Sequence, residues 1–71
     1  MSEVYQMTVT GPGDDKELRK GSLDEILRHE SELVDEFERQ GFTIRKHMVG
    51  FTGRHPRRDL EVNCEIRKAS D

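Results

Sequence analysis

The sequence predicts an α+β fold, in which a single β-α-β-β domain packs one amphipathic helix on a three-stranded mixed sheet. Residues 22–40 have the apolar periodicity of a helix. Residues 3–10, 42–52 and 59–67 have the composition and alternation of strands, and a loop at 11–21 joins the first strand to the helix. A right-handed crossover makes the first two strands parallel. The regular alternation of the third strand suits the centre of the sheet, so we expect the strand order 2-3-1.

The helix has clear start and stop signals. Ser22 and Glu25 have the spacing of a capping box, in which each residue satisfies an amide of the other. Gly41 stands where a left-handed C-cap is expected. The helix should therefore present one apolar stripe to the sheet. That stripe consists of Leu23, Ile26, Leu27, Leu33, Val34 and Phe37.

Glu30 falls in the middle of this apolar stripe. A carboxylate in a dry core is costly unless it has a partner. Lys46 lies on the inward parity of the segment 42–52 and is the nearest candidate, so we predict a buried charge pair between Glu30 and Lys46. The alternative is that Glu30 serves a functional site or an oligomer interface.

The strand patterns assign side chains to the two faces of the sheet. Pairing about a tip at 53–56 places Ile44 opposite Ile66, and Arg45 opposite Glu65 as a favourable charge pair. The side chains expected to face the helix are Tyr5, Met7, Val9, Phe42, Ile44, Met48, Leu60, Val62, Cys64 and Ile66. Those expected on the water-facing side are Thr8, Thr43, Arg45, His47, Val49, Phe51, Glu61, Asn63 and Glu65.

Length and composition limit the classes of protein to which this chain can belong. The chain has 71 residues, of which 31% are hydrophobic, and a core this small usually needs a staple or a partner chain. Cys64 is the only cysteine, so the chain forms no internal disulfide and has no metal-binding cysteine cluster. A lone thiol fits a reducing compartment, and we expect a cytoplasmic protein. No apolar run approaches the roughly 20 residues of a membrane span, so no membrane partner is expected.

The charges are unevenly distributed although the net charge is only −3. Acidic residues concentrate in the helix, whereas the segment 45–58 carries cations and no acid. Arginines on a protruding, Pro-stiffened tip can grip an acidic protein patch or a phosphate. A solvated loop is the plain alternative, and nucleic acid would use Phe51 to stack a base. The contact residues predicted for the hairpin 53–58 are Phe51, Arg54, His55, Arg57 and Arg58.

No catalytic, cofactor-binding or metal site is predicted. His29, His47 and His55 fall on different elements and do not converge with a nucleophile. Gly11-Pro12-Gly13 matches no common phosphate loop, and the acids that follow it would repel a phosphate. We therefore expect a protein that is not an enzyme and that has no cofactor.

The β-α-β-β order and the opening VYQMTVTG resemble the dodecins, small flavin-binding proteins that assemble into hollow dodecamers. The resemblance covers most of the chain and is one of topology. It implies a ligand-binding oligomer. Dodecins stack flavin on a Trp near the start of the second strand, where this chain has Phe42 and no Trp.

The function expected from these observations is that of a small non-enzymatic interaction module. It would be an adaptor, regulator or inhibitor that binds an acidic surface of another protein, of a type found among phage and mobile-element proteins. Nucleic-acid binding through the hairpin 53–58 is the first alternative, and a dodecin-like small-molecule-binding oligomer is the second. Self-association would use the free sheet face or a sheet edge.

Overall fold

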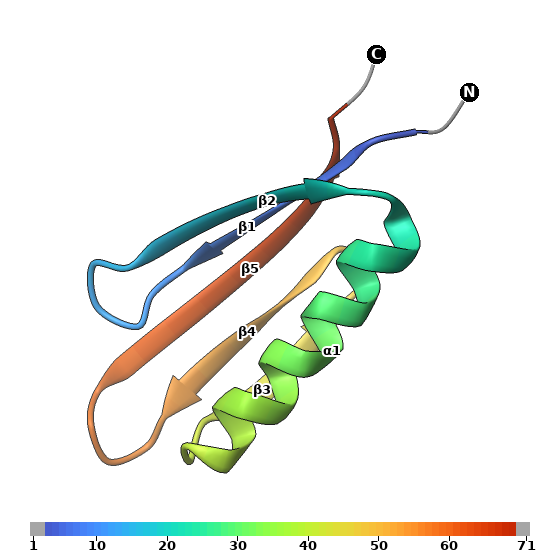
Figure 1. Ribbon diagram of the computed structural model, residues 1–71. Coiled ribbons are helices and arrows are strands. Elements are labelled where there is room, and N and C mark those ends of the chain that lie inside the picture. The colour runs from blue at the N-terminus through green and yellow to red at the C-terminus, as the bar shows by residue number, and fades with distance from the viewer. Residues whose placement is uncertain (1–2, 70–71) are drawn as a thin grey trace.

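The computed structural model describes residues 3–69 as one antiparallel sheet of five strands with a helix on one face (Figure 1). The strand order is β2-β1-β5-β4-β3, so β2 and β3 are the two edges. No helix in this part of the chain is long and apolar enough to cross a membrane. The elements are β1 (Tyr5–Thr10), β2 (Lys16–Gly21), α1 (Leu23–Arg39), β3 (Thr43–His47), β4 (Gly50–His55) and β5 (Leu60–Lys68).

The predicted three-stranded mixed sheet of order 2-3-1 is wrong, and the first reason is β2. The segment 11–21, expected to be a loop, contains this strand, which pairs antiparallel with β1. Nearly every side chain of β2 is exposed, so the strand has no apolar alternation that a sequence pattern could reveal. Backbone hydrogen bonds to β1 hold it in place instead. Because β2 reverses the chain before the helix, the helix connects β2 to β3 at the opposite edge of the sheet, and every pair of neighbouring strands is antiparallel.

The second reason is that the segment 42–52 is a hairpin and not one strand. β3 and β4 pair antiparallel, with Met48 and Val49 as the turn between them. Relative to the prediction, this turn shifts the parity of the β4 residues by one, whereas β5 keeps its predicted faces. Phe51, predicted to face water, is fully buried, whereas Met48, predicted to face the helix, is fully exposed at the turn.

The predicted cross-strand pairs also change because of this hairpin. Ile44 pairs with Gly53 and Arg45 with Thr52, both on β4, so neither reaches β5. Ile66 of β5 pairs with Met7 of β1.

The helix begins and ends close to its predicted limits. Ser22 is the N-cap, and its hydroxyl oxygen accepts a hydrogen bond from the amide of Glu25 at 3.3 Å. At the other end Gly41 has a φ of 102°, as a left-handed C-cap requires. The amide of Phe42 then donates to the carbonyl of Phe37 at 3.0 Å, which closes the last turn. These local signals explain why the sequence predicted this element correctly.

The core lies between α1 and the inner face of the sheet. The rings of Phe37, Phe42 and Phe51 meet at its centre, with centroid distances of 5.3 Å and 6.3 Å from Phe37. Edge-to-face and tilted contacts of this kind add to the gain from burial. The buried apolar residues are Met7, Val9, Ile26, Phe37, Phe42, Phe51, Val62, Cys64 and Ile66.

Gly50 allows the β3–β4 hairpin to pack against β5. Its φ of 145° is one that residues with a Cβ rarely adopt, and a Cβ here would collide with the backbone carbonyl of Cys64. Beside it, the amide of Ile66 donates to the carbonyl of Val49 at 2.8 Å. A glycine at this position is therefore needed for β4 to approach β5.

We expect Gly50→Ala to lower the free energy of unfolding by about 2 kcal/mol or more, because backbone strain and a steric clash add together. Gly13→Ala is the matched control, since Gly13 also has a positive φ (73°) but a Cβ there meets nothing within 4 Å. The control should cost about 1 kcal/mol. Urea denaturation measures both, and equal losses would contradict the role assigned to Gly50.

Candidate functional site: the outer face of the sheet

The face of the sheet opposite α1, called here the outer face, carries polar side chains on every strand. Strand pairing fixes its membership, because directly paired residues point to the same side of a sheet. Thr8, Thr43, Arg45, His47, Glu61, Asn63 and Glu65 lie on this face, as the sequence predicted. The structure adds Gln6, Thr10, Lys16, Leu18, Lys20, Thr52, Arg54 and Arg67.

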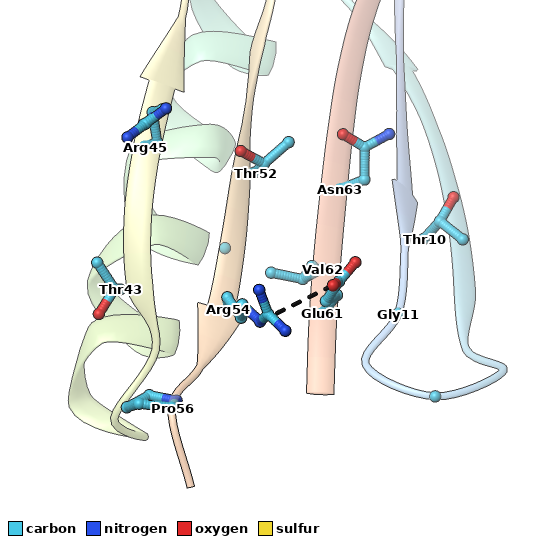
Figure 2. Close-up of a pocket in the computed structure, with 12 residues that line it drawn as sticks. Thr10, Gly11, Thr43, Arg45, Thr52, Arg54, Pro56, Glu61, Val62 and Asn63 are labelled. Atoms are coloured by element: carbon cyan, nitrogen blue, oxygen red, sulfur yellow. Dashed lines mark ion pairs between the residues drawn. The ribbon is translucent and has the colours of Figure 1, made fainter. Parts of the chain in front are cut away.

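One row of residues crosses the whole outer face. Arg45 pairs with Thr52, Thr52 with Asn63, Asn63 with Thr10, and Thr10 with Lys16. Figure 2 shows Arg45, Thr52, Asn63 and Thr10 side by side on four strands. Neutral hydrogen-bonding groups thus occupy the middle of the row, and a long cation stands at each edge. The cations at the two ends of such a row can bind carboxylates or phosphates.

A second row lies closer to the β4–β5 turn and consists of Thr43, Arg54 and Glu61. The guanidinium of Arg54 is 3.9 Å from a carboxylate oxygen of Glu61 (Figure 2). It is also 3.9 Å from a carboxylate oxygen of Asp59. All three side chains are well exposed, so these ion pairs contribute little stability. Within residues 3–69, Arg45 has no such carboxylate partner. Arg45 is therefore more available to an external anion than Arg54 is.

These rows border an open hollow of about 820 Å³ on the outer face. Small-molecule pockets of this size are usually lined by apolar and aromatic side chains. Here the side chains around the hollow are mainly polar, including Thr10, Thr43, Thr52 and Asn63 (Figure 2). None of the residues 3–69 that line it is aromatic. The hollow suits a polar, charged surface better than an apolar ligand or a stacked base.

The charges of the molecule are divided between its two faces. On the outer face, Glu61 and Glu65 are the acids, against the cations Lys16, Lys20, Arg45, Arg54 and Arg67. The exposed side of α1 has the opposite balance, with Arg28 and Arg39 among Asp24, Glu25, Glu32, Asp35, Glu36 and Glu38. The outer face is therefore the basic side of an acidic protein.

The residues predicted as one contact surface around the hairpin 53–58 do not form one. Phe51 is buried beneath α1, and His55 stands on the inner side with its ring edge-on to Phe42 at 5.3 Å. Nδ1 of His55 accepts a hydrogen bond from the amide of Arg57 at 3.1 Å. Arg57 and Arg58 are exposed in the turn after β4. Arg54 alone of the five belongs to the outer face.

The structure brings Glu30 and Lys46 together. The carboxylate of Glu30 is 6% exposed, and its Oε1 lies 4.0 Å from Nζ of Lys46, whose side chain is 57% exposed. Lys46 thus lies at the margin of the core, where its ammonium group neutralises the buried charge of Glu30. Removing the lysine would leave that charge uncompensated.

Lys46→Met should lower the free energy of unfolding by about 1 kcal/mol, a modest figure because the lysine is half in water. The double variant Glu30→Gln/Lys46→Met should recover most of this loss, since no buried charge remains. Lys20→Met is the control, an exposed lysine on the outer face without a carboxylate partner in residues 3–69. If both lysine variants unfold at the same urea concentration, the pair does not stabilise the fold.

Cys64 is a free thiol within the core. Burial, with a smaller effect of the Glu30 charge, raises the pKa of the Cys64 thiol to about 12. Because the thiolate is the reactive form, the native thiol should be inert near neutral pH.

We expect a thiol-specific reagent at pH 8 to label Cys64 in the native protein at least roughly a hundredfold more slowly than in denaturant. The labelling rate can be followed by absorbance. Rapid labelling of the native protein would show that the β4–β5 region opens readily.

The histidines do not converge on one site. His29 binds Glu17 of β2 at 3.0 Å, and His47 contacts the hydroxyl of Thr52 at 3.2 Å. His55 lies against Phe42. Among residues 3–69, no three His, Cys, Asp or Glu side chains are grouped so that they could hold a metal ion.

Sequence reasoning missed the cross-sheet row because two of its members depend on elements that the sequence did not reveal. Lys16 enters the outer face only through the pairing of β2 with β1. Thr52 enters it only through the parity shift at Met48 and Val49. Gly50 directly after that pair was the available signal, since a glycine often marks the end of a tight hairpin turn.

Comparison with family models, curated proteins and solved structures found no match. The resemblance to dodecins depended on the β-α-β-β order, and the five-stranded antiparallel sheet removes that basis. Phe42, which occupies the position of the flavin-stacking Trp, is buried and packs on Phe37. Phe42 therefore offers no exposed platform for a flavin.

Proposed function

We propose that this chain is a non-enzymatic cytoplasmic binding module whose outer face docks on an acidic surface of another protein. The observation that supports this proposal most directly is the division of charge between a basic sheet face and an acidic helix. An acidic partner would be drawn to the outer face and repelled by α1, so the charge layout also orients the encounter.

The middle of the outer face suits protein recognition. Thr10, Thr52 and Asn63 offer both donors and acceptors, which can meet the backbone and side chains of a partner. Arg45 presents a planar guanidinium that matches the geometry of a carboxylate. Interfaces of this kind gain specificity and association rate from such complementarity.

Nucleic-acid binding through the same face is the second candidate, because the cations at the two edges would also meet phosphates. The absence of aromatic side chains around the hollow disfavours single strands, whose binding relies on base stacking. Glu61 and Glu65 lie on the same face and would oppose a nucleic acid and an acidic polypeptide alike, so they do not favour either candidate.

Poly-L-glutamate serves as a model acidic polypeptide, with binding measured by titration calorimetry at low salt. We expect Arg45→Glu to weaken its binding about tenfold, because a cation that would pair with a carboxylate of the polypeptide becomes an anion that repels it. Arg39→Glu on α1 is the matched control and should change the affinity little. A DNA duplex should bind more weakly than the polypeptide.

Two results would contradict the proposal. Equal effects of Arg45→Glu and Arg39→Glu would remove the outer face as the docking surface. Tighter binding of the duplex, lost in Arg45→Glu, would favour the nucleic-acid alternative.

A further inference from the structure

We propose that the free edge of β3 binds an extended acidic peptide of the partner protein as an added strand. This inference rests on the proposed function and specifies how the partner is held. In the described part of the chain, residues 3–69, β3 pairs only with β4 and forms one end of the sheet. An edge strand of this kind is a template for main-chain pairing with another chain.

The register of the hairpin identifies the backbone groups that are available. Because the turn consists of Met48 and Val49, the flanking His47 and Gly50 form a hydrogen-bonded pair. The ladder alternates from there, so the amides and carbonyls of Ile44 and Lys46 point away from β4. Within residues 3–69 these groups have no other backbone partner. A peptide beside β3 would pair with both residues.

The charge on β3 selects the peptide. Arg45, Lys46 and His47 are consecutive and exposed, and Arg45 has no ion-pair partner in the part of the chain that the structure describes. Carboxylates opposite Arg45 and His47 would form cross-strand pairs on the outer face. The edge therefore fits a peptide that carries acids at alternate positions.

A second copy of this chain fits the same edge poorly. Antiparallel pairing of β3 with itself opposes Arg45 to Arg45 in one register and Lys46 to Lys46 in the next. Like charges directly opposite each other are destabilising. Self-pairing at this edge is thus disfavoured, whereas an acidic strand is favoured.

On the helix side of the sheet, apolar residues near β3 can contact the peptide side chains that alternate with the acids. At about 100° per residue, Leu23, Leu27 and Val34 lie on the flank of α1 opposite His29. His29 contacts β2, so this flank faces the β3 side of the sheet. Leu23 and Leu27 are 40% and 44% exposed. Apolar side chains alternating with the acids would pack between this flank and Ile44.

The opposite edge, β2, is less suitable. Its Glu17 is bound to His29 at 3.0 Å and to Arg19 at 3.5 Å, so two of the four charged side chains of β2, Glu17 and Arg19, already pair within the molecule. Side chains of both signs along β2 would repel part of any charged strand. Such charges are a common protection of edge strands.

The probe for the test is a short fluorescent peptide in which valine and glutamate alternate, with binding followed by anisotropy. Methylating the amide nitrogens on the side of the peptide that faces β3 should weaken binding at least about tenfold, because the main-chain bonds are lost. Methylating the alternate amides, which point to solvent, is the matched control and should have little effect.

Two pairs of protein variants accompany the peptide. Arg45→Glu should weaken binding about tenfold, and Arg58→Glu, in the β4–β5 turn, should not. Leu27→Ser should weaken binding about threefold, whereas Leu18→Ser, at a more exposed leucine (57% against 44%) on the opposite edge strand β2, should not. Circular dichroism verifies that each variant is folded.

The outcomes separate the two proposals. If both methylated peptides bind alike while Arg45→Glu still weakens binding, the partner docks on the outer face without strand addition, and only this inference is overturned. If Arg45→Glu and Arg58→Glu also behave alike, the proposed function fails with it. A folded protein that does not bind the alternating peptide overturns the strand-addition inference as well.

Discussion

The antiparallel pairing of β1 with β5 joins the two halves of the sheet, and the remaining contacts are built around it. One half is the β1–β2 hairpin and the other is the β3–β4–β5 meander. Met7 opposite Ile66 and Val9 opposite Cys64 place buried residues of both chain ends at the centre of the core. Because this pairing closes a loop of nearly the whole chain, its cost in chain entropy is recovered only when α1 covers the same residues.

The helix completes this arrangement by crossing from one edge of the sheet to the other. It starts directly after β2 and leads into β3, so both edge strands are linked to it (Figure 1). His29 binds Glu17 at one edge and Glu30 meets Lys46 near the other. With the apolar side of the sheet covered in this way, the outer face needs no apolar residues and is free to carry polar and basic ones.

The division of charge between the outer face and the helix explains why binding is proposed at the outer face and the β3 edge. Acids on the exposed side of α1 keep that side in water, while Arg45 stands both on the outer face and on the β3 edge. A partner drawn to the cations of the outer face therefore arrives beside backbone groups that can pair with it. Side-chain attraction and main-chain pairing would then act on the same peptide, which gives the interaction affinity as well as direction.

The sequence by itself determined the elements whose signals are local. Ser22, Glu25 and Gly41 delimit the helix, Glu30 interrupts its stripe, and alternation alone placed Asn63 on the outer face and Cys64 in the core. Only the tertiary structure decided the rest. The strand β2 exists through backbone pairing with β1 and leaves no apolar pattern, and the turn at 48–49 moves Phe51 from the outer face to the core. A site assembled from neighbouring strands depends on their register. The sequence alone does not reveal this register, because the residues that become neighbours are far apart along the chain.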